Sequence, residues 1–199
     1  AWANHARHTR FIFSKPWGYE PENPTRRMDH VNQWGFTWRV LSGMVELVTR
    51  LSVEMPHLNY VFRPHPSENL GFYQTIFSDV ANVHVMHEGS VGAWLLASQA
   101  MIHDGCTTAI EAHFSDVPII NYKSVRDSRY DLMLPNLLGT QCSTEDEVLA
   151  EIQRLSQSST RLREDNGVND LARSLIHNFE HDSFDAFTNR ILELTEKVK

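Results

Sequence analysis

The sequence predicts an α/β domain built as a doubly wound parallel sheet, followed by C-terminal helices. Three observations lead to this fold class. Short apolar runs that suit buried strands alternate with segments whose apolar residues follow helical spacing. The connections between these segments are mostly short, which favours parallel strands joined by right-handed crossovers. The chain has 199 residues, of which 41% are hydrophobic and 22% charged, a composition typical of globular domains.

Strands and helices are expected to alternate from residue 10 to residue 122. The expected strands are 10–14, 59–62, 83–86, 100–103 and 117–122, and the expected helices are 36–55, 72–78, 90–97 and 107–114. The first of these helices rests on the helical spacing of its apolar residues, and Pro56 ends it. Ser90 is expected to cap the helix over 90–97. The proline-rich residues 15–32 are expected to form an irregular connection.

The pattern changes after residue 122. Residues 123–144 are expected to be irregular, and Thr144 with Glu147 forms a capping-box pattern that predicts a helix over 145–155. Two terminal helices are expected over 168–179 and 184–198. We therefore predict an α/β domain over residues 10–142 and a helical extension over 143–199 that packs on it.

Charge and cysteine content exclude several classes of protein. The formal net charge is -7, and no Lys/Arg-rich run is present, which argues against a general nucleic-acid-binding protein. Two cysteines, Cys106 and Cys142, make no disulfide framework and favour a reducing cytoplasm. We expect neither a transmembrane segment nor a signal peptide. The sequence starts abruptly at Ala1, so we expect a fragment or a processed chain.

The stretch from Ala100 to Ala112 predicts an anion site. A short strand is followed by Gly105, which permits a tight turn, and then by the first turn of a helix, where backbone amides lack partners. The hydroxyls of Thr107 and Thr108 add donors, and Glu111 one turn later is a good acceptor for ribose hydroxyls. The alternative is a structural turn whose threonines cap the helix.

A second motif, Arg63-Pro64-His65-Pro66, follows the strand over 59–62. Its prolines stiffen the backbone around one histidine. Arg63 and His65 are both able to donate to phosphate oxygens, and a protonated His65 would stabilise charge on a departing nucleotide, which makes it the candidate catalytic residue. The alternative is a rigid turn with an exposed histidine.

Three further expectations concern single residues. The turn that contains His87 is a candidate for reading a nucleobase through its backbone groups. Cys106 is expected to be a packed thiol, with a thiolate paired with His103 as the alternative. Asp104 either orients His65 or His103 or simply ends a strand. No metal site is predicted, because the histidines lack the spacing of a zinc motif.

Four stretches of the sequence together carry a resemblance to a known family; they are residues 63–68, 83–85, 102–112 and 117–120. They resemble the C-terminal domain of surface-carbohydrate (capsule or lipopolysaccharide) biosynthesis proteins of the GT-B glycosyltransferase type. The resemblance covers residues 11–122. It implies a Rossmann-like fold, a single GT-B half, that binds a nucleotide-sugar donor without a metal. His65, Thr107 and Thr108 would contact the donor phosphates, and Glu111 the ribose.

The resemblance also implies the ligands and partners of this domain. The donor would be a CMP-sugar, such as an activated sialic or 3-deoxy-octulosonic acid, or a UDP-sugar, and the acceptor a glycan or a lipid-linked glycan. The N-terminal GT-B domain would be missing from this chain, and the location would be cytoplasmic, including the inner face of the cell membrane. The alternatives are a non-hydrolysing nucleotide-sugar 2-epimerase and a non-catalytic nucleotide-sugar-binding module.

Overall fold

The computed structural model describes residues 13–66, 68–131 and 134–157, which belong to one compact unit. The two expected terminal helices lie outside the described residues, as do residues 10–12 of the expected first strand. Phe13 and Ser14, the described part of that strand, form a turn and a bend before the 3-10 helix η1 (Lys15–Trp17). The predicted domain boundary at residue 142 stays a prediction.

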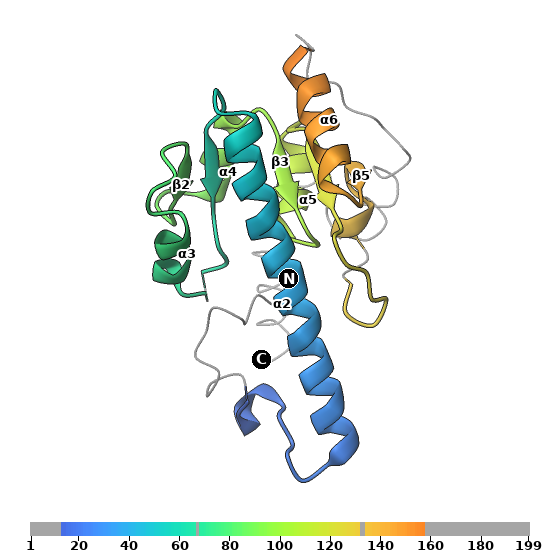
Figure 1. The fold of residues 1–199 in the computed structure, drawn as a ribbon. Coiled ribbons are helices and arrows are strands. Elements are labelled where there is room, and N and C mark those ends of the chain that lie inside the picture. Colours follow the sequence, from blue (N-terminus) through green and yellow to red (C-terminus); the bar gives the residue numbers. More distant parts are fainter. Residues whose placement is uncertain (1–12, 67, 132–133, 158–199) are drawn as a thin grey trace, which may run out of the picture. The chain divides into compact units, whose positions relative to one another are not determined.

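The described strands form two small parallel sheets (Figure 1). In the first, β1 (Tyr60–Phe62) pairs with β2 (Val83–Val85). In the second, β4 (Ile119–Tyr122) lies between β3 (Met101–His103) and β5 (Thr140–Cys142). The predicted parallel pairing is confirmed, whereas no ladder joins β1 to β3 within the described part of the chain. The fold is therefore mixed α/β with two parallel sheets.

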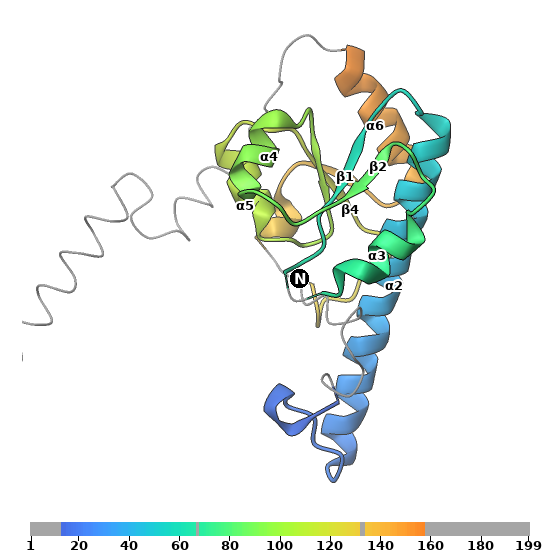
Figure 2. The same ribbon diagram turned by 90° about the vertical axis from the view of Figure 1, so that its left-hand side faces the viewer.

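Helices lie on both sides of the strands. The described α-helices are α2 (Pro24–Glu54), α3 (Leu70–Ile76), α4 (Val91–Ala97), α5 (Thr108–Phe114) and α6 (Glu145–Gln157). Figure 2 shows α4 and α5 on one side of the strands and α2, α3 and α6 on the other. None of the helices in the described ranges is both long and apolar enough to cross a membrane.

Helix α2 starts twelve residues earlier than expected, because Pro24 begins the helix instead of preventing it. A proline fits the first helical position, where its missing N–H would have no partner in any case. Asn23 caps the helix, and its side-chain oxygen accepts from the amides of Thr25 and Arg26 at 3.2 Å each. The expectation of an irregular connection up to residue 32 is therefore wrong.

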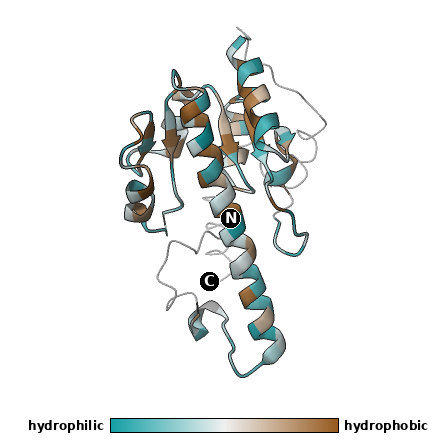
Figure 3. Ribbon diagram, in the orientation of Figure 1, coloured by the Kyte–Doolittle hydropathy of each residue, from teal (hydrophilic) through white to brown (hydrophobic). Residues whose placement is uncertain are grey.

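The C-terminal half of α2 joins the two sheets through their hydrophobic cores. Leu47 and Leu51 are fully buried in one core cluster with Ile120 of β4 and Val148 of α6. Val48, on the same helix, packs against the β1–β2 sheet instead. Figure 3 shows apolar residues in the strands and in the half of α2 beside them. The helix thus fixes both strand pairs to one scaffold.

Residues 123–144, expected to be irregular, contain the 3-10 helix η2 (Pro135–Leu137) and strand β5. Gly139 precedes β5 with a φ of +76°, and a Cβ atom there would collide with the Ile119 carbonyl. The glycine therefore lets β5 approach β4 closely. The predicted capping box is confirmed, because the Thr144 hydroxyl accepts from the Glu147 amide at 3.3 Å and the Glu147 carboxylate accepts from the Thr144 amide at 3.2 Å.

Candidate functional site

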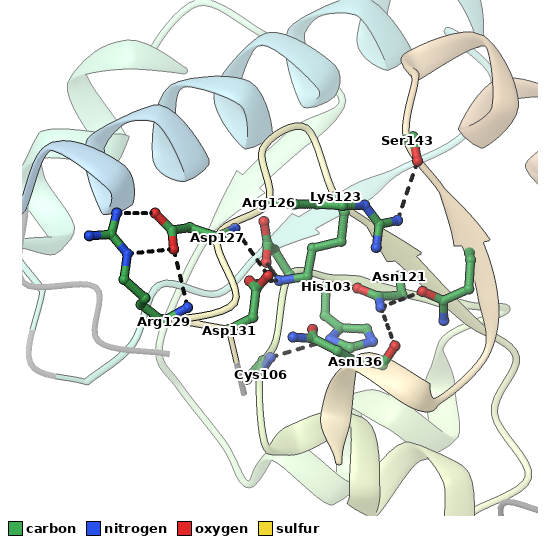
Figure 4. A network of polar contacts seen from close by, with 12 residues as sticks. His103, Cys106, Asn121, Lys123, Arg126, Asp127, Arg129, Asp131, Asn136 and Ser143 are labelled. Carbon is green, nitrogen blue, oxygen red and sulfur yellow. Dashed lines mark hydrogen bonds and ion pairs between the residues drawn. The ribbon is translucent and has the colours of Figure 1, made fainter. Parts of the chain in front are cut away.

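A row of polar side chains crosses the carboxyl end of the β3–β4–β5 sheet. His103, Asn121 and Gln141 are register neighbours on the three strands. His103 is 3% exposed and Asn121 is fully buried. The Asn121 amide donates to the Asn136 carbonyl at 2.8 Å and to Gln141 Oε1 at 2.9 Å, so the row is tied to η2 (Figure 4).

A buried ion pair lies beside this row. Lys123 directly follows β4 and is 4% exposed; its ammonium donates to Asp104, which follows β3, and to Asp131 Oδ1 at 2.9 Å. Burial raises the pKa of Asp104, and the bond and charge of Lys123 oppose that shift. Asp104 therefore pairs with a lysine and not with His65 or His103, and it directly follows the end of β3, as the second alternative expected.

Gly105 makes the tight turn that the sequence predicts. Its φ is +64°, a backbone conformation that favours glycine, and a Cβ atom there would lie 3.2 Å from Asn136 Oδ1. The next residue, Cys106, donates its backbone amide to His103 Nδ1 at 3.3 Å. The turn is thus held by the His103 side chain of the polar row.

The buried His103 is neutral. Its pKa is lowered to about 4, first because burial disfavours the charged ring and second because Lys123 is close; the Leu138 carbonyl opposes the shift. Because Nδ1 accepts a hydrogen bond, the proton of the neutral ring is on Nε2. A ring with this pKa is a poor base for the Cys106 thiol, and the amide, not the sulfur, is its partner.

Two amide oxygens at this sheet edge are buried and have no hydrogen-bond partner among the described residues. They are Asn121 Oδ1 and Asn136 Oδ1. The orientation of the Asn121 amide is fixed, because its nitrogen faces a backbone carbonyl. Since buried polar atoms are normally hydrogen-bonded, this edge of the sheet has unused acceptor capacity.

The polar residues at the start of α5 lie at the surface. Thr107 precedes the helix, is exposed, and makes no side-chain capping hydrogen bond. The interpretation of Thr107 as a side-chain cap is therefore wrong. Thr108 is half-buried and Glu111, in the first turn, is exposed. The hydroxyl of Thr107 and the carboxylate of Glu111 are thus accessible.

Arg63 has a structural role that the sequence did not predict. Its guanidinium donates to the carbonyls of Glu88 at 2.8 Å, His87 at 3.2 Å and Gly89 at 3.3 Å, and lies over the ring of Trp94. The Trp94 indole also donates to the Glu88 carbonyl, at 2.7 Å. The carbonyls expected to read a nucleobase therefore already accept hydrogen bonds, and the phosphate contact of Arg63 stays a prediction.

The predicted site residues fall into two groups. Arg63, His65 and His87 come together on the loops that follow β1 and β2, where His87 Nε2 lies 2.9 Å from the Pro64 carbonyl. Residues 105–111 follow β3 on the other sheet. Helix α2 packs against both sheets and so links the two groups. No three potential metal ligands cluster in the described ranges.

Sequence reasoning missed Asn121, Lys123 and Asn136. One signal was available for Asn121, because an amide in the apolar run 117–122 is a buried polar residue in need of partners. Lys123 and Asn136 lie in a segment without periodicity, so nothing in the sequence places them against Asp104 and Gly105.

A separate depression of about 550 Å³ lies between α2 and the start of α6. Its Arg50 donates to Glu54 at 2.6 Å, to Asp146 at 2.6 Å and to Glu145 at 3.2 Å. Because this cation is already shared among three carboxylates, the depression is poorly suited to a phosphate.

Comparisons of the chain with family models, with curated proteins and with solved structures find no match.

Proposed function

We propose that this chain carries the donor-binding domain of a metal-independent nucleotide-sugar glycosyltransferase that acts in surface polysaccharide synthesis. In this proposal the two sheets are parts of one doubly wound sheet, with β1 beside β3. Tyr60 of β1 and Ile102 of β3 pack against the same core cluster, which supports that neighbourhood. The strand order would then change direction between β1 and β3, and ligands of α/β sheets bind at such a switch point.

One observation carries the proposal: the loops after β1 and β3 have a fixed backbone and exposed polar side chains. The His65 amide donates to Glu68 at 2.8 Å and the Cys106 amide to His103 at 3.3 Å, whereas the side chains of His65, Thr107 and Glu111 are exposed. Side chains presented by a rigid backbone lose less entropy on binding.

The roles follow from which groups the fold already uses. The Cys106 amide is occupied by His103, so the hydroxyls of Thr107 and Thr108 carry the phosphate contact beside the Gly105 turn. Lys123 is not assigned to the phosphate, because Asp104 and Asp131 balance its charge. His65 stabilises the charge that develops on the leaving nucleotide, and Glu111 accepts from the ribose hydroxyls.

The donor is a CMP-sugar or a UDP-sugar, and the acceptor is a glycan or a lipid-linked glycan bound with a second domain. A thermal-shift panel on the intact chain with CMP, UMP, CDP, UDP and GDP tests the donor class. A nucleotide that binds only the folded state raises its stability by mass action, by about 2.7 kcal/mol at 100 times its Kd. Transfer of labelled sugar to an acceptor glycan then tests the transferase reaction.

Thr107 and Ser90 make a matched pair for this test. Thr107 makes no capping bond, so Thr107→Val is expected to keep the melting temperature of the free protein and to reduce the nucleotide-induced shift. Ser90 Oγ caps α4 by accepting from the Ala93 amide at 3.3 Å, so Ser90→Ala is expected to lose about 1 kcal/mol of stability and to keep the shift. An unchanged shift in Thr107→Val would remove the phosphate assignment.

A further inference from the structure

Glu68 holds both backbone polar groups of His65. Its carboxylate oxygen Oε2 accepts from the His65 amide at 2.8 Å, and its own amide donates to the His65 carbonyl at 2.8 Å. One residue therefore closes the turn that carries the exposed imidazole. The carboxylate makes a charge-assisted hydrogen bond, which is stronger than a bond between neutral groups.

Glu68 is itself anchored in the protein interior by Tyr73. The Tyr73 side chain is hydrogen-bonded to Glu68, and Tyr73 is 1% exposed, with its ring 4.9 Å from that of Phe62 in β1. Burial, and next the charge of Glu68, raise the pKa of Tyr73 far above its usual value. The phenol therefore keeps its proton and donates a hydrogen bond to the Glu68 carboxylate.

The other side of His65 is fixed as well. Pro64 is buried, and its carbonyl lies 2.9 Å from His87 Nε2. Pro64 and Pro66 each restrict the backbone next to His65. Several polar contacts thus fix the backbone around one exposed histidine.

We propose that Glu68 is a positioning residue for His65: it sets the direction of the imidazole through the His65 backbone and does not touch the ligand. The role of His65 toward nucleotide phosphate rests on the proposed function, whereas the hold of Glu68 on the His65 backbone does not. The competing explanation is that Glu68 only stabilises the turn before α3. The two explanations differ in what happens at His65 when the protein stays folded.

The first test needs no ligand. Amide hydrogen exchange and the imidazole resonances of His65 are measured by NMR on the intact chain and on the variants Glu68→Ala and Glu68→Gln. Glu68→Ala is expected to speed exchange of the His65 amide at least about tenfold, because the amide loses one hydrogen bond to a charged acceptor. The variant is also expected to shift the imidazole resonances of His65. Glu68→Gln keeps an acceptor oxygen and is expected to restore most of the protection. Unchanged His65 exchange in Glu68→Ala would overturn the proposal.

The second test uses nucleotide affinity, measured by calorimetry with whichever of CMP or UMP the intact chain binds more tightly. Glu68→Ala is expected to weaken binding by about five- to thirtyfold, and the double variant His65→Ala/Glu68→Ala to bind no more weakly than His65→Ala alone. Additive losses would mean that Glu68 acts on the ligand independently, and would overturn the proposal.

Glu147→Ala is the matched control. Its carboxylate also accepts from backbone amides, those of Ser143 at 2.6 Å and Thr144 at 3.2 Å, but it caps α6. This variant is expected to lose stability and to leave both the exchange of the His65 amide and the nucleotide affinity unchanged. A loss of affinity equal to that of Glu68→Ala would mean that general destabilisation explains the effect, and would overturn the proposal. If no nucleotide binds the intact chain, the proposed function fails and the exchange test alone decides the role of Glu68.

Discussion

The buried, neutral His103 predicts a specific loss of stability in mild acid. Its pKa is lowered to about 4 in the folded protein, from 6.5 in the unfolded chain. Below pH 6.5 the unfolded chain therefore binds a proton that the folded protein does not, and the free energy of unfolding falls until the pH reaches the folded pKa. Above pH 6.5 His103 contributes no pH dependence.

The size of the effect follows from the pKa difference. At pH 5 the difference from the unfolded pKa is 6.5 − 5 = 1.5 units, and each unit is worth about 1.4 kcal/mol, so His103 should account for about 2 kcal/mol of lost stability. This value refers to a ring that stays buried, as its 3% exposure indicates. The carboxylates whose pKa is lowered, Asp127 and Glu151, titrate below this range.

Urea unfolding at pH 7 and pH 5 measures the loss. The test variant is His103→Asn, because the Asn oxygen is able to accept from the Cys106 amide as Nδ1 does. The acid-induced loss should be smaller in this variant than in the parent by about 2 kcal/mol. The control is His84→Asn, at an exposed histidine whose ring lies 3.2 Å from Asn59 Oδ1. Equal losses in the parent and in His103→Asn would refute the reasoning.

Two other predictions concern the same sheet edge. Lys123→Met should destabilise the protein by about 3–5 kcal/mol in urea unfolding, because it leaves the carboxylate of Asp104 buried without its cation. Adding Asp104→Asn should recover part of this loss. A double variant as unstable as Lys123→Met alone would contradict the prediction. Gly105→Ala should cost about 1–2 kcal/mol, since φ is +64° and the Cβ would lie 3.2 Å from Asn136, whereas Gly92→Ala in α4 meets open space and should be neutral or stabilising by about 0.5–1 kcal/mol. Equal melting temperatures of the two glycine variants would disprove the strain argument.

The periodic parts of the chain were predictable from the sequence. The strands at residues 60–62, 83–85, 101–103 and 119–122 lie within the predicted apolar runs. Helices α4 and α5 begin within one residue of the prediction, whereas α3 begins two residues before the predicted residue 72. The start of α2 was not predictable from composition, because Pro24 and Asn23 are typical both of loops and of helix starts. The choice between them depends on packing that follows later in the chain.

The candidate site was predictable only in its local features. The Gly105 turn and the stiff backbone at His65 follow from glycine and proline, whose conformational preferences are local. The Asp104–Lys123 pair and the bond from Asn121 to Asn136 join residues that are 19 and 15 positions apart across different elements. No spacing rule predicts such contacts, so they appear only in the folded chain. The use of Arg63 by the turn over 87–89 was missed for the same reason.

The most direct test of the proposed nucleotide site is to map nucleotide binding onto the backbone. Titrating the ¹⁵N-labelled intact chain with CMP and with UDP should shift the amides of Gly105, Thr107 and His65, because these residues lie on the two loops assigned to the phosphate. Shifts confined to the depression around Arg50, or no shifts with either nucleotide, would contradict the account.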